Sequence, residues 1–517
     1  MKKTSFSANR VAVAVAVICA GASVPAFAQV EAKVTGRVHF DARSVNDGGL
    51  NTITDRDSAT TADNFELRRA RIGITGSINK AITYEVVGNA VGSSTNFVDT
   101  AFANYGFNKA AQFRAGRFKQ PFSLEELTSS NSIDFMERSY GNQMVPGKKL
   151  GMMLHGEPLA GLVYGVSAYA DGFNEVTNSN YMGSKTAVRL AYNAAQAWGS
   201  EDTVLHLGVA NTQGNSQTMP SNSGNNQEAA STTTRATIVA FRTEGRGLNN
   251  AYRLQIGGDK LLTPTTAASS CTSSAVPAGG GTPTITCTAP TLTNGGLAHG
   301  TLANNSVNIN QNMNGLELAL AKGPYKFQME NFDSKYAASG VAQDLNTKTN
   351  SDVSVNARIK AQYIEVMYNI TGEDFSKAYK GGAFGGITPK SVFMKDYGGV
   401  VGNGIGAWQV GFRTSKYESS VPVVGADAGC SATAVKCETA SNAVGLNGSR
   451  AQNSESAKTN TYALNWILNS NARVMFNYAE TTFAHPVIML DVNQTGNIVS
   501  GATDKERVIS VRTQVNF

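Results

Sequence analysis

The sequence predicts an all-β protein, a transmembrane antiparallel β-barrel of sixteen strands, with eighteen strands as the alternative. Apolar and polar residues alternate with a period of two from residue 34 onward, for example in residues 69–75 and 408–413. The connections between these segments alternate between short turns and long loops, which is typical of an outer-membrane barrel. Only 16% of the residues are charged, fewer than in an ordinary soluble domain. A soluble β-sandwich or β-propeller would also show the alternation along each strand, but not the alternating lengths of the connections.

The first 28 residues form a predicted signal peptide. Basic residues lie within the first ten positions, residues 11–22 are apolar, and the small residues Ala26 and Ala28 precede Gln29. The apolar stretch is too short for a membrane helix, which needs about 20 residues. We therefore expect cleavage near Ala28 and a mature chain of residues 29–517 that forms a single outer-membrane β-barrel domain of a bacterial-type cell.

Sixteen segments carry the strand pattern, and an even number allows a barrel to close with both termini at one rim. They begin near Val34, Phe65, Ile82, Thr100, Ala111, Leu150, Leu162, Thr186, Val204, Asn314, Tyr325, Ile359, Trp408, Tyr462, Arg473 and Arg507. Residues 238–242 and 252–256 show a similar pattern, which gives the alternative of eighteen strands. The long loops are expected near residues 123–149, 213–311, 371–406 and 419–458. The third of these interrupts the rim that otherwise carries short turns.

The face of the strands opposite the apolar one should face water inside the barrel, and it is rich in arginine. The predicted lumen-lining residues are Arg37, Arg69, Arg71, Arg114, Arg189, Arg413, Arg473 and Arg512. Acidic residues at equally clear inward positions are fewer, Asp41 being one. A narrow cationic channel attracts anions, and guanidinium offers paired donors to phosphate-like oxygens. The alternative is that these charges only keep the wall wet and pair with nearby acids.

The connection of residues 123–149 is the predicted pore constriction. It combines apolar residues such as Phe135 and Met136 with many charged ones. An external loop would gain little from so much apolar surface, whereas a loop folded against the inner wall would bury it. We therefore expect an inward-folded loop with Arg138, Lys148 and Glu137 at the constriction; a loop lying on the surface is the alternative.

Several sequence blocks resemble the phosphate-selective porin O and P family. They are Arg-Arg-Ala-Arg-Ile-Gly at 68–73, Gly-Arg-Phe-Lys-Gln-Pro-Phe-Ser-Leu-Glu at 116–125, Ser-Ser at 129–130, Phe-Met-Glu-Arg-Ser at 135–139, Ile-Thr-Gly-Glu at 370–373 and Asn-Trp-Ile-Leu-Asn at 465–469. The resemblance implies a homotrimer of sixteen-stranded barrels in the outer membrane that draws anions along a path of Arg and Lys. It also implies that the third and fifth loops and one periplasmic turn fold inward.

The resemblance also suggests roles for individual residues. It makes Arg138 the best candidate for the narrowest point of the pore. It suggests a basic entry ladder in the fifth loop, formed by Arg235, Arg242 and Arg246. If the turn of residues 371–406 folds inward, the periplasmic exit would be lined by Lys377, Lys380 and Lys390; an ordinary exposed basic turn is the alternative.

Four cysteines remain after removal of the signal peptide, and they lie in two close pairs within the long loops. In an exported protein the pairs Cys271 with Cys287 and Cys430 with Cys437 suggest loop disulfides. Free thiols are the alternative. A zinc site is less favoured, because no histidine lies near either pair.

The function expected from these observations is an outer-membrane pore for passive diffusion of small anions, with phosphate or polyphosphate as candidates. A general non-selective porin is the alternative, and an adhesive or structural surface barrel is less favoured. We expect no enzyme, because the five histidines are scattered and no nucleophile motif is present. We expect no cofactor, metal or nucleic-acid partner; the expected partners are small anionic solutes and outer-membrane lipid.

Overall fold

The computed structural model describes most of the chain from Val30 to Phe517. The described residues are 30–47, 64–91, 97–172, 182–218, 236–248, 251–256, 271–273, 285–287, 300–302, 307–344, 350–393, 404–420, 451–452, 454–492 and 498–517. The predicted signal peptide and its cleavage site lie outside these ranges. No helix among the described residues is long and apolar enough to cross a membrane.

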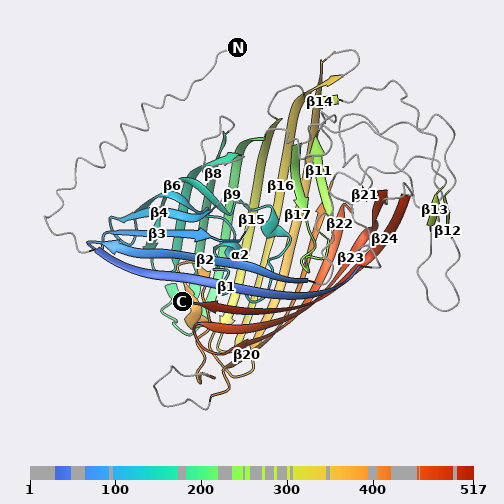
Figure 1. Ribbon diagram of the computed structural model, residues 1–517. Coiled ribbons are helices and arrows are strands. Elements are labelled where there is room, and N and C mark those ends of the chain that lie inside the picture. The colour runs from blue at the N-terminus through green and yellow to red at the C-terminus, as the bar shows by residue number, and fades with distance from the viewer. Residues whose placement is uncertain are drawn as a thin grey trace, which may run out of the picture.

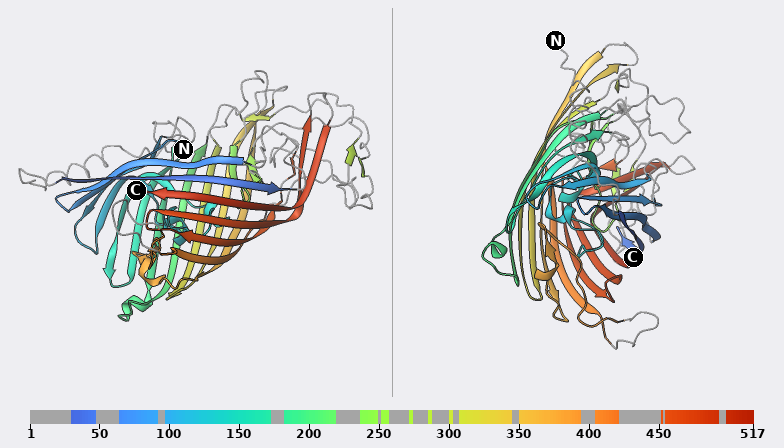
Figure 2. Two further views of the ribbon diagram at one scale, coloured as in Figure 1. Left: turned by 60° about the horizontal axis from the view of Figure 1, so that its bottom comes forward. Right: turned by 90° about the vertical axis from the view of Figure 1, so that its left-hand side faces the viewer.

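Sixteen wall strands form a closed antiparallel β-barrel, and the short strands β14 (Gly300–Leu302) and β21 (Ala451–Gln452) pair with wall strands in the same sheet. Figures 1 and 2 show the barrel. Each wall strand pairs with its neighbours in chain order, and β24 returns to pair with β1, with Val38 opposite Val515. The wall strands are β1 (Val30–Asn46), β2 (Asn64–Ile78), β3 (Ile82–Asn89), β4 (Val98–Gly106), β5 (Gln112–Lys119), β6 (Lys148–Leu159), β7 (Leu162–Gly172), β8 (Met182–Asn193), β9 (Thr203–Thr218), β15 (Val307–Lys322), β16 (Tyr325–Asp344), β17 (Asn350–Asn369), β20 (Ala407–Ser419), β22 (Ser456–Ile467), β23 (Ala472–Val492) and β24 (Ile498–Asn516).

The prediction of sixteen strands is confirmed, and each predicted starting point lies in a wall strand or next to one. The eighteen-stranded alternative is wrong. Its two extra segments are β10 (Ala236–Phe241) and β11 (Tyr252–Ile256), which pair with each other in a separate hairpin. Smaller elements are β12 (Cys271–Ser273), β13 (Ile285–Cys287), β14 (Gly300–Leu302), β21 (Ala451–Gln452) and α3 (Ala194–Ala197), which lies in the turn between β8 and β9.

Burial along the wall strands is inverted relative to a soluble sheet. In β8, Val188 and Leu190 are exposed on the outer face, whereas Arg189 between them is only 3% exposed. Apolar outer positions suit lipid, and polar inner positions suit a barrel that contains water or packed polar groups. The same alternation runs along β17, where Val366 is exposed and Glu365 is buried.

The connection between β5 and β6, residues 120–147 and here called the inserted loop, folds into the barrel. It contains α2 (Leu124–Leu127) and η2 (Gly141–Gln143). The backbone N–H groups of Leu124 and Glu125 donate to the Glu330 carboxylate of β16 at 2.9 and 2.7 Å. A carboxylate in this position satisfies N–H groups that the first turn of a helix leaves unpaired. The expectation of an inward-folded loop is therefore confirmed, with α2 inside the ring of strands (Figure 1).

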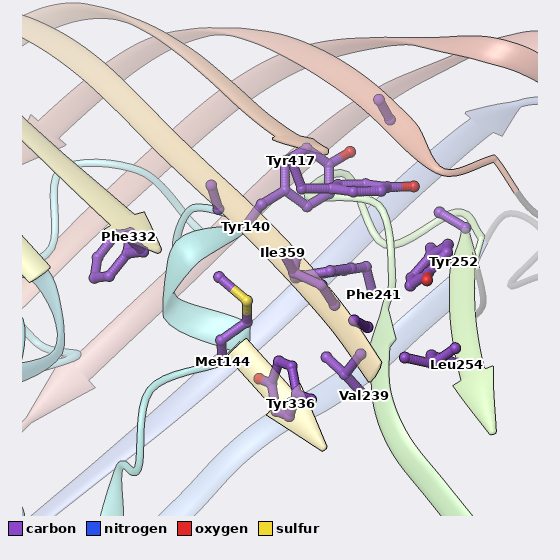
Figure 3. Packing of buried hydrophobic residues seen from close by; sticks show 14 of the residues in the cluster. Tyr140, Met144, Val239, Phe241, Tyr252, Leu254, Phe332, Tyr336, Ile359 and Tyr417 are labelled. Carbon is purple, nitrogen blue, oxygen red and sulfur yellow. The ribbon is translucent and has the colours of Figure 1, made fainter. Parts of the chain in front are cut away.

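Aromatic packing holds the inserted loop and the β10–β11 hairpin against the inner wall (Figure 3). Tyr140 of the loop lies edge-on to Tyr417 of β20, with ring centroids 4.8 Å apart. Phe241 of the hairpin stacks on the same Tyr417 at 4.5 Å. Gly141 allows the close approach of the loop to Phe332, because a Cβ atom there would lie 2.1 Å from that ring. The buried cluster thus joins both inserted segments to the wall.

The described residues 370–393 of the long connection between β17 and β20, here called the inner turn, also enter the barrel. Its short elements are η3 (Ser376–Ala378), β18 (Tyr379–Lys380) and β19 (Ala383–Phe384). Phe375 and Phe384 pack in one cluster with Leu124 and Phe135 of the inserted loop. Two inserted segments therefore meet inside the barrel and leave only part of its cross-section open.

Candidate functional site

A cavity of about 800 Å³ lies between the inserted loop and the wall formed by β1 to β8. Nine basic side chains line it, against three acidic ones. The basic residues are Arg37, Arg69, Arg71, Arg114, Arg117, Lys119, Arg138, Lys148 and Arg189, and the acidic residues are Glu85, Asp99 and Glu126. The cavity therefore carries a strong excess of positive charge.

Three of these guanidinium groups have no ion-pair partner in the part of the chain that the structure describes. Arg37 donates to the Ser130 hydroxyl at 2.8 Å, and Arg69 lies 3.3 Å from Nδ1 of His39. Arg114 lies over the Phe102 ring at 4.4 Å. None of the three has a described carboxylate oxygen within 4.0 Å. Their charge is therefore compensated less than that of the other cavity arginines.

The two basic residues predicted at the constriction both line this cavity, and both have acidic neighbours. Arg138 lies 3.3 Å from the Glu126 carboxylate and donates to the carbonyl oxygens of Glu125 and Thr128 at 3.1 and 2.9 Å. Lys148 pairs with Asp99, which Arg71 also contacts at 2.9 Å. Arg138 therefore orders its own loop while presenting its charge to the cavity.

Glu137 does not line the cavity; it anchors the inserted loop. Its carboxylate lies 2.9 Å from both Arg68 and Arg512 and 3.5 Å from Arg246. Burial raises the pKa of Glu137, but the attraction of these three arginines prevails and holds its pKa well below the usual range. The carboxylate is therefore charged at neutral pH and joins β2, β24 and the fifth loop.

Three of the predicted lumen-lining arginines are buried beneath the inserted loop. Arg413 contacts Glu125 at 3.1 Å and Glu244 at 2.8 Å, and its side chain is 2% exposed. Arg512 is fully buried against Asp41 and Glu137. Arg473 donates to the Ile133 carbonyl at 2.9 Å. All three point inward, but they fix the loop and the first two have no surface in the open cavity.

Arg189 combines both situations, because it lines the cavity and is paired. It contacts Glu317 at 2.6 Å and donates to the Gly382 carbonyl of the inner turn at 2.8 Å. Nε2 of His206 lies 3.0 Å from the same Glu317, and its Nδ1 lies 2.6 Å from the Tyr379 hydroxyl. This chain of contacts ties the inner turn to the wall.

Arg117 and Lys119 are cavity residues that the sequence pattern did not identify. Arg114 and Arg117 both line the cavity although they are three positions apart, so strict alternation fails between them. Gly116 has a φ of 129°, a backbone conformation that favours glycine. A glycine inside a strand often marks such an irregularity, so Gly116 is the feature of the sequence from which the break in alternation could have been predicted.

The entry and exit residues suggested by the family resemblance have different surroundings. Arg235 lies outside the described residues. The backbone of Arg242 exchanges two hydrogen bonds with the Gln143 side chain, and burial lowers the pKa of Arg246, near Glu137, to about 10. The side chains of Lys377, Lys380 and Lys390 are exposed on the inner turn.

A second cavity of about 300 Å³ lies on the other side of residues 129–134 of the inserted loop. Its lining is mostly hydroxyl and amide groups, with Arg473 and Asp134 as the charged members. Both cavities reach Ser129. Residues 129–134 of the inserted loop therefore lie between the basic cavity and this polar one.

The cysteine predictions remain open. Cys271 and Cys287 are register partners in the hairpin of β12 and β13. Cys430 and Cys437 lie outside the described residues. Within the described part of the chain, no group of three or more His, Cys, Asp or Glu side chains could hold a metal ion.

Comparison with known proteins identifies a family. The model of the phosphate-selective porin O and P family matches residues 32–250 and 291–517. No curated protein sequence matches the chain. Among solved structures, the outer membrane channel DcaP of Acinetobacter baumannii is 10% identical, covers 96% of this chain and 100% of its own, and has a TM-score of 0.42. OmpT of Vibrio cholerae is 9% identical, covers 96% of this chain and 99% of its own, and has a TM-score of 0.43. Salmonella typhi OmpF in complex with daunomycin is 12% identical, covers 94% of this chain and 97% of its own, and has a TM-score of 0.37.

Proposed function

The chain belongs to the phosphate-selective porin O and P family and is an outer-membrane porin channel, and we propose that it conducts small anions by passive diffusion. The observation that supports this proposal is the set of guanidinium groups without ion-pair partners, Arg37, Arg69 and Arg114, in a cavity with nine basic and three acidic side chains. A site of this kind stabilises anions electrostatically, because charges inside a narrow pore are screened less than at an open surface.

The proposed path runs from the long loops into the basic cavity, past Arg138, and through the polar cavity near Arg473 to the inner turn. Each guanidinium is a weak and separate site. Conduction needs several weak sites, because one deep site would hold the ion and slow its release. The exposed lysines of the inner turn would then receive the anion at the exit.

A general porin without charge preference is the second candidate. It is favoured by the many inward basic residues that already have carboxylate partners, such as Arg189, Arg413 and Lys148. Paired charges contribute little net field at a distance. The two candidates therefore differ in whether the three arginines without such partners dominate the field in the pore.

Four finer features are part of the proposal. Phosphate and polyphosphate are the candidate solutes, a homotrimer is the expected assembly, the mature chain begins after Ala28, and the paired cysteines of the long loops form disulfides. The family supports a channel rather than an enzyme or an adhesive barrel.

The test is the zero-current potential of the purified protein in a planar bilayer under a KCl gradient, followed by titration with phosphate. The proposal expects a potential of the sign given by chloride permeation, with conductance reduced by phosphate. A potential of the opposite sign, or none, would leave a general porin. An anion-type potential without block by phosphate would keep the anion channel and reject phosphate as its solute.

A further inference from the structure

Part of the lining of the basic cavity is apolar. It includes Phe102, Pro121, Leu127, Met153 and Val163 beside the charged groups described above. Phe102 and Val163 are only partly buried. The inner surface of a water-filled barrel is ordinarily polar, and small inorganic anions gain nothing from apolar side chains. This apolar part of the lining therefore suits a ligand that has an apolar group as well as a charge.

The aromatic ring of Phe102 is held in place by its neighbours. It lies edge-on to Phe118 with ring centroids 6.4 Å apart, and Phe118 is only 1% exposed. The Phe102 ring is therefore fixed in the cavity wall rather than free to move with the solute.

Arg114 lies where the apolar and the charged parts of the cavity lining meet. Its guanidinium lies 4.4 Å from the centre of the Phe102 ring, and its Nε donates to the Asn104 side chain at 3.3 Å. Among the described residues, no carboxylate oxygen lies within 4.0 Å of it. A planar guanidinium stacks on aromatic faces and also binds carboxylate or phosphate oxygens through its N–H groups. One residue thus offers both contacts that an aromatic anion needs.

We propose that Phe102 and Arg114 form a subsite for organic anions in which an aromatic ring carries a carboxylate or phosphonate group. The ring lies against Phe102, and the anionic group lies toward Arg114 and the neighbouring basic wall. This inference rests on the anion channel proposed above and specifies a solute class for the same cavity. Ring contact removes apolar surface from water, which a small anion of equal charge cannot do.

The experiment uses the purified full-length protein in a planar bilayer with KCl on both sides. Sodium benzoate or sodium acetate is added to one side, and the concentration that halves the chloride conductance is measured for each. Both anions carry one carboxylate, so they differ in the ring. The subsite predicts that benzoate blocks at a concentration about fivefold to tenfold lower than acetate does.

Two variants locate the effect. Phe102→Ala should bring the ratio of the two blocking concentrations close to one, mainly through weaker block by benzoate. Phe476→Ala is the matched control, because it removes the same side chain from the lipid-facing surface of β23, where Phe476 is 42% exposed. This control should keep the wild-type ratio.

The outcomes separate the subsite from the anion channel itself. A chloride-type zero-current potential with equal block by benzoate and acetate would overturn the subsite and leave the anion channel standing. A potential without anion sign would reject the anion channel, whatever the ratio. If Phe102→Ala forms no channels, the ratio of the two blocking concentrations in the wild type still tests the subsite, because equal block by benzoate and acetate would overturn it. A wild-type ratio that Phe102→Ala and Phe476→Ala leave equally unchanged would also overturn it.

Discussion

Arginines on two parts of the inner wall have opposite surroundings. On β1, β2 and β5, Arg37, Arg69 and Arg114 face the cavity without a described carboxylate within 4.0 Å. On β20 and β24, Arg413 and Arg512 are each in contact with two carboxylates beneath the inserted loop. The same residue type at the same kind of inward position therefore contributes pore charge in one region and structure in the other. The role of each arginine depends on whether a carboxylate lies within contact distance of its guanidinium group.

The largest expected effect is a loss of stability when an arginine beneath the inserted loop is replaced. Arg413→Met would leave the buried carboxylates of Glu125 and Glu244 without their cation. Burial already raises the pKa of Glu125, so its charged form depends on that partner. We expect a loss of about 3–5 kcal/mol in the free energy of unfolding, measured by urea unfolding of the barrel from lipid vesicles.

The matched control is Arg358→Met in β17, which removes an arginine paired with Asp333 on the surface. The Arg358 side chain is 49% exposed. Water replaces such a partner easily, so the loss should be much smaller than that of Arg413→Met. Equal losses for the two variants would show that the buried ion pairs do not hold the inserted loop.

A smaller effect on stability is expected for Glu137→Gln, and it should depend on pH. Burial raises the pKa of Glu137, but Arg68, Arg512 and Arg246 lower it further, so the pKa lies well below the usual range. A lowered pKa stabilises the folded chain above the pKa of the unfolded state, and this contribution is lost as the pH falls through the folded-state pKa.

The wild type should therefore exceed Glu137→Gln by about 2 kcal/mol at neutral pH. The difference should stay constant down to about pH 5 and shrink below about pH 4. Unfolding curves at several pH values would measure it. A difference that grows on acidification would contradict the assigned charge of Glu137.

The comparison also explains what the sequence could predict. Alternation with a period of two identified the wall strands and the inward direction of Arg413 and Arg512, because side-chain direction is a local property of a strand. It could not identify Glu125, Glu244 and Glu137 as the partners of these two arginines, because pairing depends on which strands and loops meet across the barrel. Eighteen strands stayed open for a similar reason, since β10 and β11 carry a strand pattern but pack inside.

In the cavity region, the expected effect is on ion preference. Arg138→Glu should reduce the anion preference much more than Lys458→Glu, because Arg138 lines the cavity and Lys458 is exposed. The zero-current potential under a KCl gradient measures both. Equal shifts would reject Arg138 as a residue of the constriction.

The central claim is that the arginines without carboxylate partners set the ion preference of the pore. The most direct test is the zero-current potential of the triple variant Arg37→Gln, Arg69→Gln and Arg114→Gln beside that of the wild type in the same KCl gradient. The claim predicts that the anion-type potential falls to near zero or changes sign while the channel still conducts. A triple variant with the wild-type potential would contradict it.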